Sequence, residues 1–259
     1  MDFRSTFDEV AELYDVIRPR YPEALFAELV LRAGLHPNAQ LLEIAPGTGQ
    51  ATLPLAKRGY RITAVELGVR MARIARERLK AYANLSILNA SFEEASLPAG
   101  AFDLIYVATA FHWVAPTVRF AKSHELLKSS GHLAVIHRHH VSDERGDAFT
   151  AATQPIYQRY EPQTATGART YVPRPRGHLR PEPIDETLFS PVSFDTFQEV
   201  VRYSAREYVD LLSTYSPTLA MAPDARAAFL ADIGALVDQR FGGQVLQHYA
   251  MSLQIAQRR

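Results

Sequence analysis

A glycine-rich turn between two short apolar segments constrains the fold of this chain more than any other feature. An apolar run at 41–44 stops at the turn Pro46–Gly49, a helical pattern follows, and a second apolar run ends at Glu66. This order predicts a strand, a tight turn, a helix and a second strand, which together form a βαβ unit. Gly47 and Gly49 have no Cβ, so the backbone of the turn can come close to a ligand.

The acid after the second apolar run narrows the class of ligand. Glu66 stands about 20 residues beyond the turn, where a carboxylate can accept hydrogen bonds from ribose hydroxyls. We therefore predict a nucleoside-containing cofactor. Thr52 occupies the third glycine position of a dinucleotide fingerprint, and Gln50 stands where a phosphate-binding loop requires lysine. Glu43, at the end of the first strand, suits a ligand with an ammonium group and a positive sulfur better than it suits phosphates.

The segment Glu43–Gly49 resembles the first motif of class I S-adenosylmethionine (SAM) dependent methyltransferases, acid-x-Gly-x-Gly-x-Gly, with Ala45 at the first glycine position. Further segments resemble the small-molecule branch of the trans-aconitate methyltransferase type, in the same order, over residues 7–138. These segments are Tyr14–Pro22, Ser91–Glu93, Phe102–Ile105, Ala110–Trp113, His124–Lys128 and Gly131–Ala134, with a looser match at Tyr203–Tyr208.

This resemblance implies an α/β fold: a doubly wound, mostly parallel seven-stranded sheet with helices on both faces and an antiparallel last strand. The apolar runs at 85–88, 104–107 and 133–136 agree, because strands of a parallel sheet are buried on both faces and read as continuous runs.

We expect one Rossmann-like methyltransferase domain over residues 1–259. Within it we expect an N-terminal helical lid over 1–36, in which a capping box from Thr6 to Glu9 opens a helix. We also expect an extended Pro/Arg-rich loop over 161–191, a strand over 194–202 and a helical insertion over 204–243 before the last strand.

The resemblance also implies a cofactor-binding set at the N-terminal segment and at the ends of the first four strands. Glu66 would bind the ribose, Phe92 would pack on the adenine, and Arg18 would meet the cofactor carboxylate. Structural roles compete at several positions: Phe92 as an ordinary core residue, Thr109 as a helix cap, and Arg18 as a residue that fixes the chain direction before a proline. The full predicted set is Tyr14, Arg18, Glu43, Ala45, Gly47, Thr48, Gly49, Gln50, Glu66, Leu67, Ser91, Phe92, Ala108 and Thr109.

His112 is the candidate catalytic residue, because histidine can act as a general base near neutral pH. A structural histidine beside Trp113 is the competing interpretation. Tyr21, Trp113 and His137 are the candidate substrate residues. His137 and His139 share one strand face, a spacing that can bind metal, but an obvious acidic third ligand is missing nearby. We therefore predict no metal site.

Composition excludes several classes of protein. Lys plus Arg and Asp plus Glu number 28 each, and the chain has no cysteine. Hence we expect no nucleic-acid partner, no disulfide and no thiolate metal site. No apolar run approaches the ~20 residues of a membrane span, and the first residues carry no apolar signal core. We expect a cytoplasmic protein with a small-molecule partner and no membrane partner, and leave a homo-oligomer open.

The predicted function is methyl transfer from SAM to a small-molecule acceptor by in-line displacement, with an oxygen, nitrogen or carbon acceptor left open. Two alternatives remain at this point. One is a SAM-binding protein of methyltransferase fold without catalysis, and the other is an NAD-dependent enzyme, which the missing third glycine disfavours.

Overall fold

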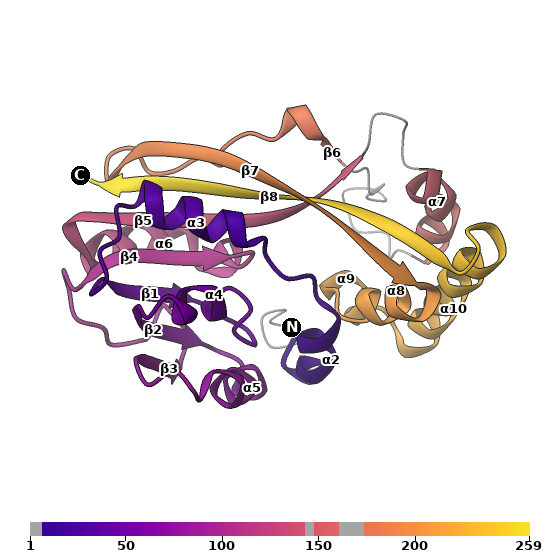
Figure 1. The fold of residues 1–259 in the computed structure, drawn as a ribbon. Helices are drawn as coiled ribbons and strands as arrows, with labels where there is room; N and C mark the ends of the chain where they lie inside the picture. Colours follow the sequence, from indigo (N-terminus) through magenta and orange to yellow (C-terminus); the bar gives the residue numbers. More distant parts are fainter. Residues whose placement is uncertain (1–6, 143–147, 161–173) are drawn as a thin grey trace.

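A computed structural model of the protein describes residues 7–142, 148–160 and 174–259. Its framework is a twisted sheet in the strand order β3-β2-β1-β4-β5-β8-β7 (Figure 1). Strands β1 to β5 run parallel, and β8 runs antiparallel to both of its neighbours. The strands are β1 Gln40–Ile44, β2 Arg61–Glu66, β3 Leu85–Asn89, β4 Phe102–Ala108, β5 Leu127–Ser142, β7 Phe189–Ser204 and β8 Gln244–Arg258, and a short β6 Arg174–Pro175 pairs with β5. The predicted seven-stranded Rossmann-like fold with an antiparallel last strand is confirmed.

Helices surround this sheet and extend beyond one end of it (Figure 1). They are α2 Ala11–Ile17, α3 Glu23–Arg32, α4 Thr52–Lys57, α5 Val69–Leu79, α6 Pro116–Leu126, α7 Ala148–Tyr160, α8 Ala205–Leu212, α9 Ser216–Leu219 and α10 Pro223–Arg240, with 3-10 turns η1 Phe111–Trp113 and η2 Arg176–His178. None of the described helices is long and apolar enough to cross a membrane.

The alternation of side chains along β1 shows why the sheet needs cover on both faces. Leu41 is buried in one core with Phe26 of α3 and Leu55 of α4. Its neighbour Leu42 is buried in the opposite core, which also contains Leu126 of α6. Full burial of each such leucine is worth about 1.5–3 kcal/mol. Both faces of β1 thus contribute to stability, as the continuous apolar run indicated.

Three long strands connect the sheet to a group of helices at its far end. β7 and β8 pair from Phe189 with Arg258 to Ser204 with Gln244. Together with β5 they extend past β1–β4 toward helices α7 to α10, which we call the cap (Figure 1). Ser204 opens α8 with a capping box, because its Oγ accepts from Glu207 N at 3.3 Å and its N–H donates to Glu207 Oε2 at 2.8 Å.

One boundary needs correction. The prolines predicted a loop as far as residue 191 and a strand from 194, whereas β7 begins at Phe189. Pro191 is tolerated in this strand because β7 lies at the edge of the sheet and its register shifts between Pro191 and Ser193. The expected capping residue Thr6 and the part of the expected loop at 161–173 lie outside the described residues.

Candidate active site

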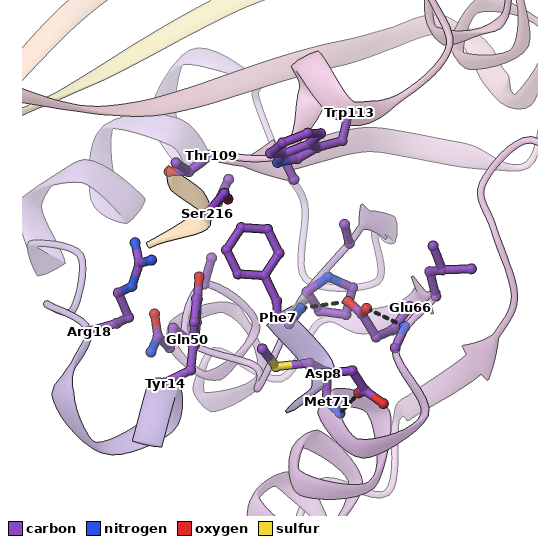
Figure 2. Close-up of a pocket in the computed structure, with 18 of the residues that line it drawn as sticks. Phe7, Asp8, Tyr14, Arg18, Gln50, Glu66, Met71, Thr109, Trp113 and Ser216 are labelled. Atoms are coloured by element: carbon purple, nitrogen blue, oxygen red, sulfur yellow. Dashed lines mark hydrogen bonds between the residues drawn. The ribbon is translucent and has the colours of Figure 1, made fainter. Parts of the chain in front are cut away.

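A cavity of about 290 Å³ opens at the carboxyl ends of β1, β2 and β4. Ligands of open α/β sheets bind in this position. Figure 2 shows side chains converging on the cavity from the sheet, from the N-terminal segment and from the start of α9. Twelve of the residues predicted to bind cofactor or substrate or to act in catalysis line it: Tyr14, Arg18, Tyr21, Ala45, Gly47, Gln50, Glu66, Leu67, Ala108, Thr109, His112 and Trp113.

The glycine turn after β1 has the left-handed backbone that its sequence indicated. Gly47 has φ +60° and Gly49 has φ +86°. Ala45, at the first glycine position of the motif, also has a positive φ, +51°. An L-residue in this region costs roughly 1–2 kcal/mol. The surrounding structure holds the turn in place, since Ala45 N donates to Val65 O of β2 at 2.9 Å.

Glu66 ties this turn to the end of β2. Its Oε2 accepts from Gly47 N and its Oε1 from Gly68 N, both at 2.8 Å (Figure 2). The side chain is buried, and burial raises the pKa of its carboxyl, whereas the bonds from Gly68 and Gly47 lower it. A carboxylate has about four lone-pair sites. Glu66 can therefore hold the turn and still accept from two ligand hydroxyls.

A second strained residue lies at the exit of β4. Thr109 has φ +59°, which is unusual for a β-branched residue. Its N–H donates to Ile136 O at 2.7 Å, and its Oγ1 is 3.0 Å from the hydroxyl oxygen of Tyr21. Such strain clusters at functional sites, where the surrounding structure maintains it. Thr109 and Ala45 thus present strained backbone to the same cavity from adjacent strands.

Arg18 brings a positive charge to the cavity. Its guanidinium lies over the rings of Tyr14 and Tyr215, at 4.7 and 4.3 Å from the ring centroids. It donates from Nε to Thr214 Oγ1 at 2.8 Å and from Nη2 to the Thr214 carbonyl at 2.6 Å. Within the described ranges it forms no ion pair. The nearby Gln50 has a buried Nε2 that finds no acceptor among the described residues. Two donors therefore face the cavity with capacity to bind an anion.

Several cavity residues were not in the predicted set. They come from the N-terminal segment, the turn, α5 and the start of α9: Phe7, Asp8, Pro46, Ala51, Gly68, Met71, Ala110, Tyr215, Ser216 and Pro217. Phe7 packs edge-on against Tyr14 and Trp113, each with centroids 6.1 Å apart. Asp8 Oδ1 accepts from Met71 N at 2.9 Å, near the start of α5 (Figure 2). These contacts bring together residues far apart in the chain, which no local pattern reveals.

Six predicted residues do not line the cavity: Glu43, Thr48, Gly49, Ser91, Phe92 and His137. Phe92 is 4% exposed and packs in the core on the α6 side of the sheet. Ser91 Oγ donates to Glu94 Oε2 and accepts from Glu94 N, so it organises a local turn. His137 Nε2 lies 3.3 Å from Glu182 Oε2. Its ring centroid is 6.2 Å from that of His112.

His112 and Trp113 reach the cavity from η1. Their ring centroids are 4.8 Å apart. Burial lowers the pKa of His112, and the neighbouring His137 lowers it further. The neutral imidazole, which can accept a proton, is therefore favoured near neutral pH. In the described part of the chain, no three His, Cys, Asp or Glu side chains form a group that could hold a metal ion.

Glu43 differs from its predicted role in a way that has a thermodynamic consequence. It is 1% exposed, and Tyr106 donates to its Oε2 at 2.7 Å. Burial raises the pKa of Glu43 to about 7, although the neighbouring Thr52 and the bond from Tyr106 lower it. In the ligand-free protein, burial therefore weakens the negative charge that the predicted role of Glu43 relies on.

We expect the free energy of unfolding to fall as the pH rises through the range in which the Glu43 carboxyl titrates. The unfolded carboxyl titrates near its ordinary value of 4.5 and the folded one at about 7, so the unfolded state releases its proton first. At about 1.4 kcal/mol for each pKa unit, the loss is on the order of 3 kcal/mol. Glu43→Gln mimics the protonated acid. We compare the free energy of unfolding in urea between the variant and the wild type at pH 5 and at pH 8. This difference should shift in favour of the variant at pH 8. The same difference at both pH values contradicts the pKa assigned to Glu43.

Comparison with known proteins agrees with this geometry. Residues 42–135 match a family described as a methyltransferase domain. The matched segment runs from β1 into β5 and carries the glycine turn, Glu66, Thr109 and His112. Over this segment the chain is therefore similar to a methyltransferase domain, in the part of the fold that lines the cavity.

Curated relatives are similar over parts of the chain. A protein named as a methyltransferase from Dictyostelium discoideum is 26% identical over 166 residues, 58% of this chain and 61% of that protein. An rRNA adenine N-6-methyltransferase from Saccharopolyspora erythraea is 34% identical over 79 residues, 30% of this chain and 21% of the relative. Malonyl-[acyl-carrier protein] O-methyltransferase from Geobacter sulfurreducens is 33% identical over 128 residues, 48% and 46% of the two chains. The chain thus spans less than two thirds of the length of each of these three relatives.

Solved structures share the fold over nearly the whole length. A structure described as a type II methyltransferase from Anaeromyxobacter dehalogenans has a TM-score of 0.62 and 22% sequence identity, and the match covers 93% of this chain and 97% of that one. At this identity the likeness shows the fold alone.

Proposed function

We propose that this protein transfers a methyl group from SAM to a small-molecule acceptor. The observation that carries the proposal is the convergence of the glycine turn, the Glu66 carboxylate and the Arg18 guanidinium on one cavity at the carboxyl ends of the strands. The position of this cavity is typical of ligand sites in open α/β sheets. The match over residues 42–135 supports the same activity.

The lining residues fit the parts of SAM. Glu66 would accept from the ribose hydroxyls, and the turn at Gly47 leaves room because no Cβ projects into the cavity. The donors of Arg18 and Gln50 would bind the carboxylate of the cofactor. NAD fits less well, because the third glycine position of its fingerprint holds Thr52, which is fully buried in α4.

SAM supplies a methyl group on a cationic sulfur, so transfer is an in-line displacement in which the bond to sulfur breaks as the bond to the acceptor forms. The protein has to place the acceptor atom ~3–3.5 Å from that methyl group. Where the acceptor carries a proton, His112 is our candidate base, and Tyr21, Trp113 and His137 are our candidate substrate residues. The cavity position of His112 favours catalysis over a binding-only protein.

A pH profile tests the role of His112. If it takes a proton from the acceptor, the rate should fall on the acidic side as His112 is protonated, at a pH below its ordinary pKa of 6.5. His112→Asn should remove this acidic limb and lower kcat about a hundredfold at saturating SAM. His124→Asn, on α6 outside the cavity, is the matched control. A variant that keeps the wild-type rate and profile assigns His112 to structure.

We propose that the N-terminal segment closes the site. Asp15 pairs with Arg78 of α5 at 2.6 Å, and Arg18 binds Thr214 beside α8, so this segment spans the cavity. Lids of this kind commonly move on microsecond to millisecond timescales. S-Adenosylhomocysteine should protect residues 10–22 from hydrogen exchange and leave α6 unchanged. Equal exchange with and without the ligand contradicts a lid.

The segment 161–191 is a second candidate lid, with 161–173 outside the described residues.

A metabolite screen tests the proposed acceptor class. The protein, isotope-labelled SAM and a pool of small metabolites should yield a labelled small molecule. Because one relative is an rRNA methyltransferase, total RNA is the second arm of the screen. The zero net formal charge of the chain argues against RNA. Label in RNA and none in metabolites contradicts the proposed small-molecule acceptor. It also contradicts the acceptor class that the resemblance to the trans-aconitate type implies.

A further inference from the structure

A second, smaller cavity of about 180 Å³ lies under the cap. Side chains from β5, α7, α8, α9 and β8 enclose it. Tyr215 and Pro217 line this cavity and also the first one, so they form the partition between the two. Tyr215 is fixed in this position, since its hydroxyl oxygen lies 3.2 Å from His140 Nε2 and its ring lies under the Arg18 guanidinium.

The size and walls of the second cavity suit one aromatic ring. An apolar protein cavity of roughly 150 Å³ binds benzene, and this one is slightly larger. Phe149 and Tyr208 form an edge-to-face pair on its wall, with centroids 5.0 Å apart. Tyr157 is a third aromatic wall residue. Aromatic side chains prefer edge-on or offset contacts with other rings, so this wall favours an aromatic ligand.

The polar groups of the second cavity are uncharged near neutral pH. Among the described residues, no Asp, Glu, Lys or Arg lines it. His140 is held neutral, because burial and then the charge of Arg138 lower its pKa to about 4. The remaining polar lining residues are Thr150, Thr153, Thr218, Gln247 and the tyrosines Tyr157, Tyr208 and Tyr215. A cationic group here would be repelled by Arg138 and Arg18, and an anionic group would lose its hydration with no charged side chain among the described lining residues to pair with.

We infer that the second cavity binds an uncharged aromatic ring with a small hydrogen-bonding substituent. This site adjoins the proposed cofactor site and is separated from it by Tyr215 and Pro217. The ligand class of the second cavity is therefore a neutral aromatic compound.

Ligand-observed NMR with p-cresol and its anionic analogue 4-methylbenzoate tests this inference on the full chain. p-Cresol should bind the wild type, both alone and with saturating S-adenosylhomocysteine, and 4-methylbenzoate should bind at least tenfold more weakly. Thr150→Phe fills the cavity from α7 and should weaken p-cresol at least tenfold while its affinity for S-adenosylhomocysteine stays unchanged. Ala151→Phe, on the exposed neighbouring position of α7, should bind p-cresol like the wild type.

Three results overturn the inference: no p-cresol binding to the wild type, undiminished binding to a folded Thr150→Phe variant, or competition between p-cresol and S-adenosylhomocysteine. Competition would place the ring in the first cavity. Failure of S-adenosylhomocysteine to bind, with p-cresol bound and lost in Thr150→Phe, instead rejects the proposed function and leaves the aromatic site standing.

Discussion

Replacing Glu66 by alanine is expected to weaken S-adenosylhomocysteine binding at least about a hundredfold. On the proposed ribose role, the variant loses two charge-assisted hydrogen bonds to the ligand, each worth about 1.5–3 kcal/mol. A tenfold change in affinity corresponds to about 1.4 kcal/mol. It also loses the acceptors for Gly47 N and Gly68 N, so the turn is held less firmly. Isothermal titration calorimetry measures the affinity directly.

Two controls separate binding from folding. Glu77→Ala removes a carboxylate from the exposed face of α5, where it pairs with Lys80, and should leave the affinity unchanged. Thermal unfolding of Glu66→Ala should show a folded protein. Wild-type affinity in folded Glu66→Ala rules out the ribose role assigned to this residue.

Replacing Gly47 by valine is expected to abolish detectable S-adenosylhomocysteine binding. The position has φ +60°, a region that β-branched residues rarely adopt. The nearest atom to an added Cβ is Tyr14 Cε1 at 4.0 Å, so the ligand-free protein has room for the side chain. The backbone cost should therefore be about 1–2 kcal/mol, and the main effect should fall on ligand affinity.

Gly34 offers a matched control for the backbone. Its φ is +57°, and an added Cβ there meets nothing within 4 Å. Gly34→Val should lose a similar amount of stability as Gly47→Val in urea unfolding and bind S-adenosylhomocysteine like the wild type. If both variants lose binding equally, or neither does, the turn at Gly47 does not cradle the cofactor.

The sequence predicted the sheet and the convergence of the glycine turn and Glu66 on one edge of it, because both depend on local patterns. A buried parallel strand reads as a continuous apolar run, and residues 41–44 show it. The glycine turn and Glu66 come together because adjacent parallel strands end at the same edge, as the pairing of β1 with β2 shows.

The sequence could not predict the contacts that complete the cavity. Arg18 binds Thr214, 196 residues away, and Asp8 binds the start of α5, 63 residues away. Such pairs depend on how the cap and the N-terminal segment pack, which no short pattern encodes. The same packing decides that Phe92 faces the core rather than the cavity, although its motif resembles an adenine-binding segment.

The position of the first glycine in the motif shows how tertiary structure overrides a local rule. Alanine disfavours a left-handed backbone, yet Ala45 adopts φ +51° between β1 and the turn. The hydrogen bond from Ala45 N to Val65 O and the ties from Glu66 hold the turn in this conformation. The departure from the motif therefore leaves the cradle intact.

Calorimetric titration of the wild-type chain with S-adenosylhomocysteine, and in parallel with NAD, tests the central claim most directly. We expect saturable binding of one S-adenosylhomocysteine per chain, competition by SAM, and no heat from NAD. Binding of NAD without binding of S-adenosylhomocysteine would contradict it.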